Sequence, residues 1–217
     1  MPDYAAQRRN MIEAQIRAND VTDVRIQAAM GDIPRERFVP AAKRAVAYTD
    51  VPVEVVAGRW LMDPRSFAKL VQLASIAPTD TILDVGCATG YSTAILARLG
   101  KSVMALEQDA DLVRIAPDML QAVKAGNASV VQGSLADGYR LKAPYDVIFI
   151  NGAIEGEPEK LLSQLAEGGR LVAIMHKGEL GRAQLFVRRE GHIGRRADFD
   201  ASVPLLAGFR IPAGFVF

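Results

Sequence analysis

Short apolar runs alternate with amphipathic segments along most of this 217-residue chain. An apolar run bounded by glycine or polar residues predicts a buried strand, and apolar residues spaced three and four apart predict a helix packed against it. We expect strands at 81–85, 102–106, 130–131, 145–150, 170–175, 183–188 and 201–206. Alternating strands and helices predict a doubly wound, mostly parallel α/β sheet of seven strands. The last two strands have no helix between them, which predicts an antiparallel edge.

The helical patterns predict a helical extension before this sheet and connecting helices within it. The extension has three expected helices. The first spans 4–19, the second runs from an N-cap at Thr22 to Met30 and stops at Gly31, and the third spans 64–76. Asp63 caps the last of these, with Pro64 at its first position. Later helices are expected after Gly90, over 109–125 with a kink or restart at Pro117, and over 157–165. We therefore predict one domain, with an extension over 1–77 and a sheet-based core over 78–217.

The stretch over 81–92 is the one around which the chain is organised. Its apolar run stops at Gly86 and Gly90, and an alanine-rich helical pattern follows. A strand that turns on glycine into a helix presents free backbone N–H groups to a polar or anionic ligand. Glu107 closes the next expected strand, where its carboxylate would accept hydrogen bonds from both hydroxyls of a ribose. The pattern predicts a nucleoside-cofactor site.

The spacing of the glycines narrows the choice of cofactor. A dinucleotide fingerprint has Gly-x-Gly-x-x-Gly, whereas here Gly86 and Gly90 are separated by three residues, with Ala88 in the middle. Asp84 would bring a negative charge to the ligand, which suits an amino group and a sulfonium better than a pyrophosphate. The pattern resembles motif I of the class I S-adenosylmethionine-dependent methyltransferases. A nicotinamide dehydrogenase is disfavoured, and a glycine turn that only packs a helix on a strand is the bland alternative.

Polar residues at the expected carboxyl ends of the strands point to one site, because ligands of such sheets bind at that edge. These residues are Asp84, Glu107, Ser134 and Asn151. Each has a plainer reading: Asp84 or Asn151 caps a loop, and Ser134 is an ordinary turn residue.

Composition excludes several other classes of protein. A net charge of +1 gives no indication of nucleic acid or an anionic membrane as partner. The single cysteine, Cys87, excludes an internal disulfide, and no signal peptide or membrane-spanning run is evident, so we expect a soluble, cytoplasmic protein. His176 and His192 lie outside every motif and are read as structural or surface residues, so no metal site is expected.

Several segments in order resemble the protein-L-isoaspartate O-methyltransferase family, over most of the chain. They are 33–40 (IPRERFVP), 47–52 (AYTDVP), 83–91 (LDVGCATGY), 143–148 (APYDVI), 161–165 with 168–172, and Val203-Pro204-Leu205. The resemblance implies a Rossmann-like fold, S-adenosyl-L-methionine as cofactor (product S-adenosyl-L-homocysteine), and methylation of isoaspartyl carboxylates in a protein or peptide substrate during protein repair. It implies a cofactor site at Asp84, Gly86, Cys87, Ala88, Gly90, Tyr91, Glu107, Gln108, Ser134, Leu135 and Asn151. It implies substrate contacts at Leu61, Met62, Val203, Pro204 and Leu205.

The substrate side of the pattern departs from the family. The family's substrate loop typically reads Gly-Gln-Thr-Ile-Ser-Gln-Pro, and here 58–64 reads GRWLMDP. Trp60 and Met62 replace two hydroxyl residues, and a thioether donates no hydrogen bond. Whether Met62 abolishes activity or redirects it stays open. Asp84 stands where the family more usually has Glu, and Ser134 where it has an adenine-contacting Asp, which leaves Ser134 or Asp137 for that role.

For the expected methyl transfer, the main task of the protein is to align the reacting atoms. An isoaspartyl carboxylate is ionised at neutral pH, so no strong base is needed, and oxygen, methyl and sulfur must be aligned in a dry pocket. No catalytic residue is certain; the loop residues Arg59, Trp60 and Met62 are the candidates. Arg59 and Arg65 either bind a substrate carboxylate or are solvated.

Three questions stay open at this point. The alternatives to isoaspartyl methylation are a different acceptor or a catalytically silent cofactor-binding regulatory protein. The apolar ending over 205–217 suits either a contact surface or a core edge strand. The protein is expected to be a monomer or a homodimer.

Overall fold

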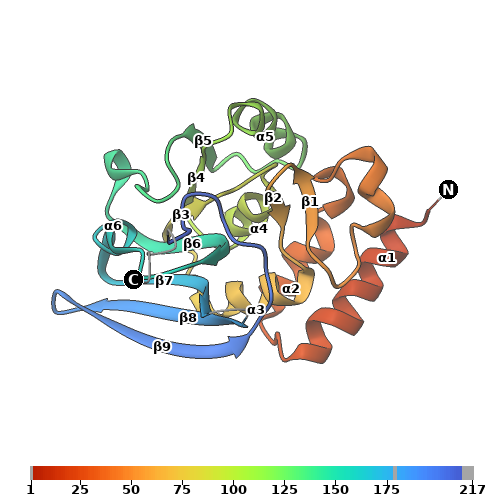
Figure 1. Ribbon diagram of the computed structural model, residues 1–217. Coiled ribbons are helices and arrows are strands. Elements are labelled where there is room, and N and C mark those ends of the chain that lie inside the picture. The colour runs from red at the N-terminus through yellow and green to blue at the C-terminus, as the bar shows by residue number, and fades with distance from the viewer. Residues whose placement is uncertain (1, 178–179, 212–217) are drawn as a thin grey trace, which may run out of the picture.

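One sheet of seven strands forms the centre of the molecule, in the order β5-β4-β3-β6-β7-β8-β9 (Figure 1). The computed structural model describes residues 2–177 and 180–211. Strands β5 to β7 are parallel, and β8 and β9 add antiparallel at one edge. The predicted fold class is therefore confirmed. The strands are β3 (Thr81–Val85), β4 (Ser102–Glu107), β5 (Ala128–Gln132), β6 (Tyr145–Ile154), β7 (Leu165–Lys177), β8 (Leu180–Arg189) and β9 (His192–Asp200).

Alternate residues of the central strands point into two separate hydrophobic cores. On β6, Val147 and Phe149 belong to the first core, whereas Ile148 and Ile150 belong to the second. Side chains of α3 (Pro64–Ala74), α4 (Tyr91–Leu99) and α5 (Ala110–Ala122) fill the first core. The short α6 (Glu159–Leu162) and the loop side chains around Leu135 fill the second. Because both faces of the strands are covered, the strands are apolar runs, as the sequence indicated.

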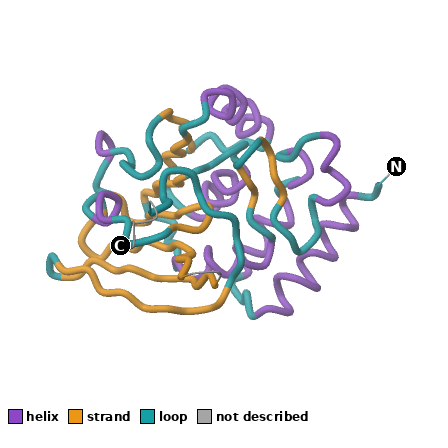
Figure 2. Tube along the Cα trace, in the orientation of Figure 1, coloured by secondary structure: helices purple, strands orange, loops and turns teal. Residues whose placement is uncertain are grey.

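The first sixty residues form a helical cap at one end of the sheet, shown in purple at the right of Figure 2. Helix α1 (Tyr4–Met11) continues through a π-helical turn (Ile12–Ile16) and a 3₁₀ turn (Arg17–Asn19), as predicted for 4–19. Helix α2 (Val24–Asp32), two 3₁₀ turns (Arg35–Arg37 and Ala41–Val46) and the small hairpin of β1 (Val53–Val56) and β2 (Arg59–Leu61) follow. Among the described residues, no helix is long and apolar enough to cross a bilayer.

Several predicted boundaries are wrong. Asp23, not Thr22, caps α2, because its carboxylate accepts the Arg25 N–H, and Gly31 lies inside this helix. Helix α6 is only one turn long, and α5 runs through Pro117 without a restart.

Residues 201–206 are not a strand; one isolated bridge joins Leu205 to Ala153. The strand lies earlier, at β9, whose residues are largely exposed on both faces. With no buried face, β9 carries no apolar alternation by which it could be recognised.

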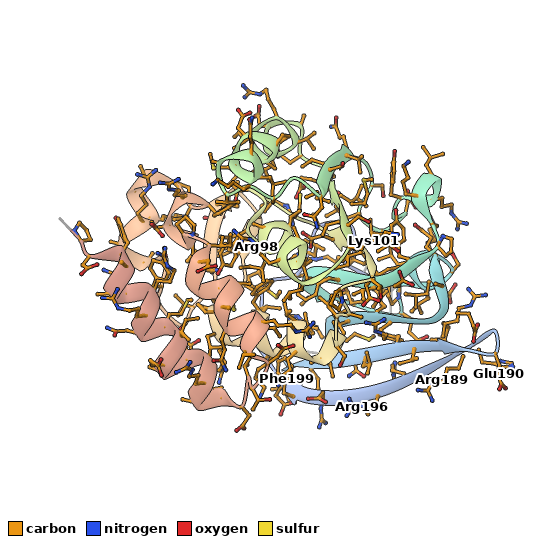
Figure 3. All side chains as sticks on the ribbon, turned by 180° about the vertical axis from the view of Figure 1, so that it is seen from behind. Arg98, Lys101, Arg189, Glu190, Arg196 and Phe199 are labelled. Atoms are coloured by element: carbon orange, nitrogen blue, oxygen red, sulfur yellow. The ribbon has the colours of Figure 1, made fainter. Side chains whose placement is uncertain are left out.

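Strands β8 and β9 form a hairpin at the edge of the sheet, in which β8 pairs with β7 and β9 lies outermost. Its two-residue turn is Glu190-Gly191, both at positive φ (50° and 77°), as the right-handed twist of a tight hairpin requires. Figure 3 shows Arg189 and Glu190 at this tip, far from Arg98 and Lys101. At the other end of β9, the Lys69 ammonium lies 5.0 Å from the centre of the Phe199 ring and attaches the hairpin to α3.

Candidate functional site

The turn between β3 and α4 brings the backbone close to neighbouring side chains. Gly86 and Gly90 have φ of 79° and 94°, a region that side chains disfavour. A Cβ at Gly86 would lie 3.0 Å from the Leu206 side chain and 3.1 Å from the Arg59 guanidinium. Glycine is therefore required at position 86 both for the turn and for this close approach.

Glu107 ends β4 beside this turn and is fully buried. Its Oε1 accepts the backbone N–H groups of Gln108 (2.9 Å) and Asp109 (3.2 Å). Its Oε2 accepts the Ala88 N–H at 2.8 Å and the Arg59 Nη2 at 2.5 Å. Four donors thus converge on one carboxylate at the carboxyl edge of the sheet.

Arg59 reaches Glu107 from β2, and only 5% of its side chain is exposed. The two sequence-based alternatives, a solvated arginine or one that faces a substrate carboxylate, both differ from this buried ion pair. Its Nε has no hydrogen-bond partner in the described part of the chain. Sequence reasoning missed the pair because 48 residues separate its members and nothing local links them. Arg65, in contrast, is partly exposed, 4.0 Å from Asp50.

Asp84, the other carboxylate of this edge, is also fully buried but is surrounded by neutral donors. The hydroxyls of Ser92 (2.8 Å) and Thr93 (2.6 Å) donate to its Oδ2, and the Asn151 amide donates to its Oδ1. Burial raises the pKa of Asp84 to about 6, although these hydrogen bonds oppose the rise. Ser92 and Thr93 were not predicted; their place in the first turn of α4, directly above the strand that carries Asp84, was the available signal.

A second wall of the site comes from two segments that are distant in sequence. Figure 1 shows the chain after β9, in dark blue, passing beside β1 and β2 over the sheet edge. Trp60 and Met62 of the loop line one small cavity there together with Asn151, Pro204, Leu205 and Leu206. They also line a second cavity with Leu61, Gly86, Cys87 and Tyr91. The structure therefore brings the predicted substrate loop and Pro204-Leu205 together, beside the glycine turn.

A buried arginine supports this wall from below. Arg35 donates to the carbonyl oxygens of Ala47 (2.7 Å) and Met62 (2.6 Å), and its guanidinium lies 4.8 Å from the centre of the Tyr91 ring. Phe38 is also buried, and its carbonyl accepts the Thr89 hydroxyl at 2.7 Å. The segment over 35–38 therefore fixes both the loop at Met62 and the glycine turn.

The remaining predicted residues lie around this centre in different ways. Gln108 and Ser134 are exposed, while Leu135 and Val203 are buried in the two cores. The Asp137 carboxylate accepts the Lys160 ammonium at 2.6 Å, and both are exposed. Cys87 is buried, and desolvation together with the charges of Asp84 and Glu107 raises the pKa of its thiol, so it is a poor nucleophile. His176 and His192 lie on β7 and β9, away from the cavities.

Comparison with known proteins identifies related sequences. Residues 6–205 match the family model described as protein-L-isoaspartate(D-aspartate) O-methyltransferase (PCMT). A protein-L-isoaspartate O-methyltransferase from Koribacter versatilis is 36% identical over 204 residues, which cover 94% of this chain and 92% of the relative. One from Methanoculleus marisnigri is 36% identical over 187 residues, covering 86% and 85%.

Solved structures share the fold. A protein-L-isoaspartate O-methyltransferase structure superposes with a TM-score of 0.81 at 23% identity, over 93% of this chain and 66% of the other. A beta-aspartate methyltransferase (PCMT) from Plasmodium falciparum, solved in complex with S-adenosyl-L-homocysteine, has a TM-score of 0.79 at 20% identity, over 92% and 97%.

Proposed function

Because this chain belongs to the protein-L-isoaspartate(D-aspartate) O-methyltransferase family, we propose that it transfers the methyl group of S-adenosylmethionine to isoaspartyl carboxylates in damaged proteins. The observation that carries the proposal is the meeting of two features at one sheet edge. One is the glycine turn with the buried Glu107 carboxylate, and the other is the loop that carries Trp60 and Met62.

The chemistry of the residues present fits this cofactor. Glu107 is a buried carboxylate at the end of β4, where it can accept hydrogen bonds from vicinal ribose hydroxyls, and Gly86 leaves room that a Cβ would fill. Asp84, Ser92, Thr93 and Asn151 form the polar base of the site. When bound, S-adenosylmethionine supplies an electrophilic methyl group on its sulfonium.

The residues of this chain would act by positioning the substrate and by excluding water from the site. An isoaspartyl carboxylate is already a nucleophile at neutral pH, so no side chain has to remove a proton. Trp60, Met62 and Leu206 would exclude water from the line of transfer, since all three line the small cavities at the edge. Met62 stands where the resembled family loop typically has serine, and its side chain contributes bulk without donating a hydrogen bond.

The test is transfer of labelled methyl from S-adenosylmethionine to an isoaspartyl peptide by the natural protein, with the matching aspartyl peptide as substrate control. Met62→Ser is assayed alongside, with Met104→Ser as a matched control, since Met104 is a partly buried methionine on β4 that lines neither cavity. We expect turnover of the isoaspartyl peptide only, and a kcat/KM at least about tenfold higher for Met62→Ser.

Equal labelling of both peptides would contradict the assignment of the acceptor. Silence of the natural protein and of Met62→Ser, both with bound S-adenosylhomocysteine, would contradict isoaspartyl methylation and leave a different acceptor or a binding role.

A further inference from the structure

The Arg59 guanidinium lies where the proposed function needs a ribose. Arg59 Nη2 is 2.5 Å from Glu107 Oε2, and the side chains are 5% and 0% exposed. The other Glu107 oxygen is held by two backbone N–H groups, and the Ala88 N–H shares Oε2 with Arg59. A ribose hydroxyl that donates to this carboxylate therefore competes with Arg59 for the same oxygen.

The space around the pair leads to the same conclusion. The two cavities at this edge measure about 10 Å³ each, enough for one water molecule and far too small for an adenosyl group. Leu206 and Arg59 together fill the hollow above Gly86. A ligand of nucleoside size enters only if these side chains leave.

The β1–β2 turn that precedes Arg59 is exposed and irregular. Residues 57 and 58 are exposed, Gly58 has a φ of 72°, and the pairing of β1 with β2 shifts register between Glu54 and Val56. The side chain of Glu54 spans this turn, because its Oε1 accepts the Gly58 N–H at 3.2 Å. The far end of the loop is fixed, since buried Arg35 holds the Met62 carbonyl. Opening therefore displaces the β1–β2 turn and the side chains of Arg59 and Leu206, while Met62 stays fixed.

We propose that Arg59 is a built-in competitor for the cofactor: it closes the site by pairing with Glu107, and the cofactor binds only after this latch opens. The proposal rests on the proposed function, because it takes Glu107 as the ribose acceptor. It makes Arg59 a determinant of cofactor affinity, and it couples cofactor binding to movement of the β1–β2 turn, where the substrate loop over 58–64 begins. A latch closed in about nine molecules of ten raises the apparent Kd about tenfold.

The test measures binding of S-adenosylhomocysteine, so its readout is independent of turnover. Calorimetry gives the Kd of the natural protein and of Arg59→Gln, which carries the glutamine typical of the family loop. The control is Arg65→Gln, because Arg65 is a partly exposed residue of α3. Circular dichroism and thermal unfolding of each variant establish that it is folded. We expect a Kd about tenfold lower for Arg59→Gln and an unchanged Kd for Arg65→Gln.

The natural protein provides a second measurement that needs no variant. Trp60, the only tryptophan of the chain, adjoins Arg59, so its fluorescence reports on the latch. In stopped flow with excess S-adenosylhomocysteine, latch opening before binding makes the observed rate level off with concentration. In Arg59→Gln the rate should rise linearly.

The outcomes separate the two proposals. Equal or weaker binding by Arg59→Gln, beside normal binding by the natural protein, overturns the latch and leaves the proposed function standing. Binding by Arg59→Gln alone supports the latch and shows that the natural protein stays closed, against its proposed activity. Absence of binding by both folded proteins overturns the latch and the proposed function together.

Discussion

Two buried carboxylates, Asp84 and Glu107, lie at the same edge of the sheet in different electrostatic surroundings. Glu107 has the Arg59 guanidinium and three backbone N–H groups. The donors that reach Asp84 are two hydroxyls and an amide. Burial without a cation raises the pKa of Asp84 to about 6, and the charge on Glu107 adds to the rise.

This difference predicts how stability depends on pH. Between the ordinary pKa of 3.8 and the folded value of about 6, the native state keeps a proton on Asp84 that the unfolded chain releases. The contribution of Asp84 to the free energy of unfolding is therefore largest below pH 3.8 and declines until the pH exceeds about 6. At about 1.4 kcal/mol per pKa unit, the decline amounts to about 3 kcal/mol. In Asp84→Asn the side chain cannot ionise, so this variant should lack the decline in the free energy of unfolding.

Urea unfolding of the natural protein and Asp84→Asn, from pH 4 to pH 7, measures this effect. The free energy of unfolding of Asp84→Asn minus that of the natural protein should rise by about 2.4 kcal/mol over this range, since a small part of the decline lies below pH 4. Asp111→Asn, at an exposed position of α5, is the control and should give a flat difference. A flat difference for Asp84→Asn too would show that Asp84 titrates as in the unfolded chain.

At the residue scale, local sequence patterns predict the position of a side chain on its strand but not its contacts with distant segments. Asp84 and Glu107 end consecutive parallel strands, so both were expected at one edge. Arg59 was not expected to face Glu107, because the contact depends on how the β1–β2 hairpin folds over the sheet. No periodicity or motif in 53–61 specifies that approach.

Among the elements, α3 begins at a capping aspartate, Asp63. The Asp63 carboxylate accepts the Ser66 N–H at 2.8 Å, and Pro64 occupies the first helical position. The helix is buried along Phe67, Leu70 and Val71, so fraying at its start would disturb the first core. Asp63→Ala should lower the free energy of unfolding by about 1 kcal/mol.

Asp63→Asn is the matched variant, because its amide oxygen can still accept the Ser66 N–H. Denaturant titrations of the three proteins should place Asp63→Asn close to the natural protein. An equal loss in both variants would mean that the carboxylate charge, and not the cap, is what matters at position 63.

The central strands were predictable, whereas the edge strand β9 was not, and neither was the β1–β2 hairpin, although alternate residues of β1 and β2 are buried. Strands β3, β4 and β6 are apolar runs that enter both cores, and each was expected from its composition. Strand β9 has charged side chains at Arg195, Arg196 and Asp198, and within the described residues it pairs with β8 alone. Backbone pairing with β8 makes it a strand, and the sequence of β9 alone does not encode that pairing.

For the molecule as a whole, Arg170 joins the C-terminal end of α3 to the sheet. From β7 its guanidinium donates to the carbonyl oxygens of Ala74 (3.1 Å) and Ser75 (2.8 Å), where α3 ends, and to Asp80 at 2.6 Å before β3. It also reaches the Asp146 carbonyl at 3.3 Å. Arg170→Met should lower the free energy of unfolding by about 3 kcal/mol, since the Asp80 carboxylate and three carbonyl oxygens lose a donor in a mostly buried place.

Equilibrium unfolding measures this loss, with Arg114→Met as the control, because Arg114 forms an exposed pair with Asp111 and its removal should have no measurable effect. The m-value should stay unchanged if α3 and the sheet unfold together. A loss no larger than that of the control would show that apolar packing alone holds the end of α3 on the sheet.

The strand order also bears on how the chain can fold while it is being synthesised. The order β5-β4-β3-β6-β7-β8-β9 means that β4 and then β5 add on one side of β3, after which β6 to β9 add in turn on the other. Every strand that leaves the ribosome therefore joins at a free edge, and none has to insert between two strands already paired. The sheet can grow from its first strand outward, and the turn that carries Gly86 is in place before the chain that closes over it, residues 201–211, has been made.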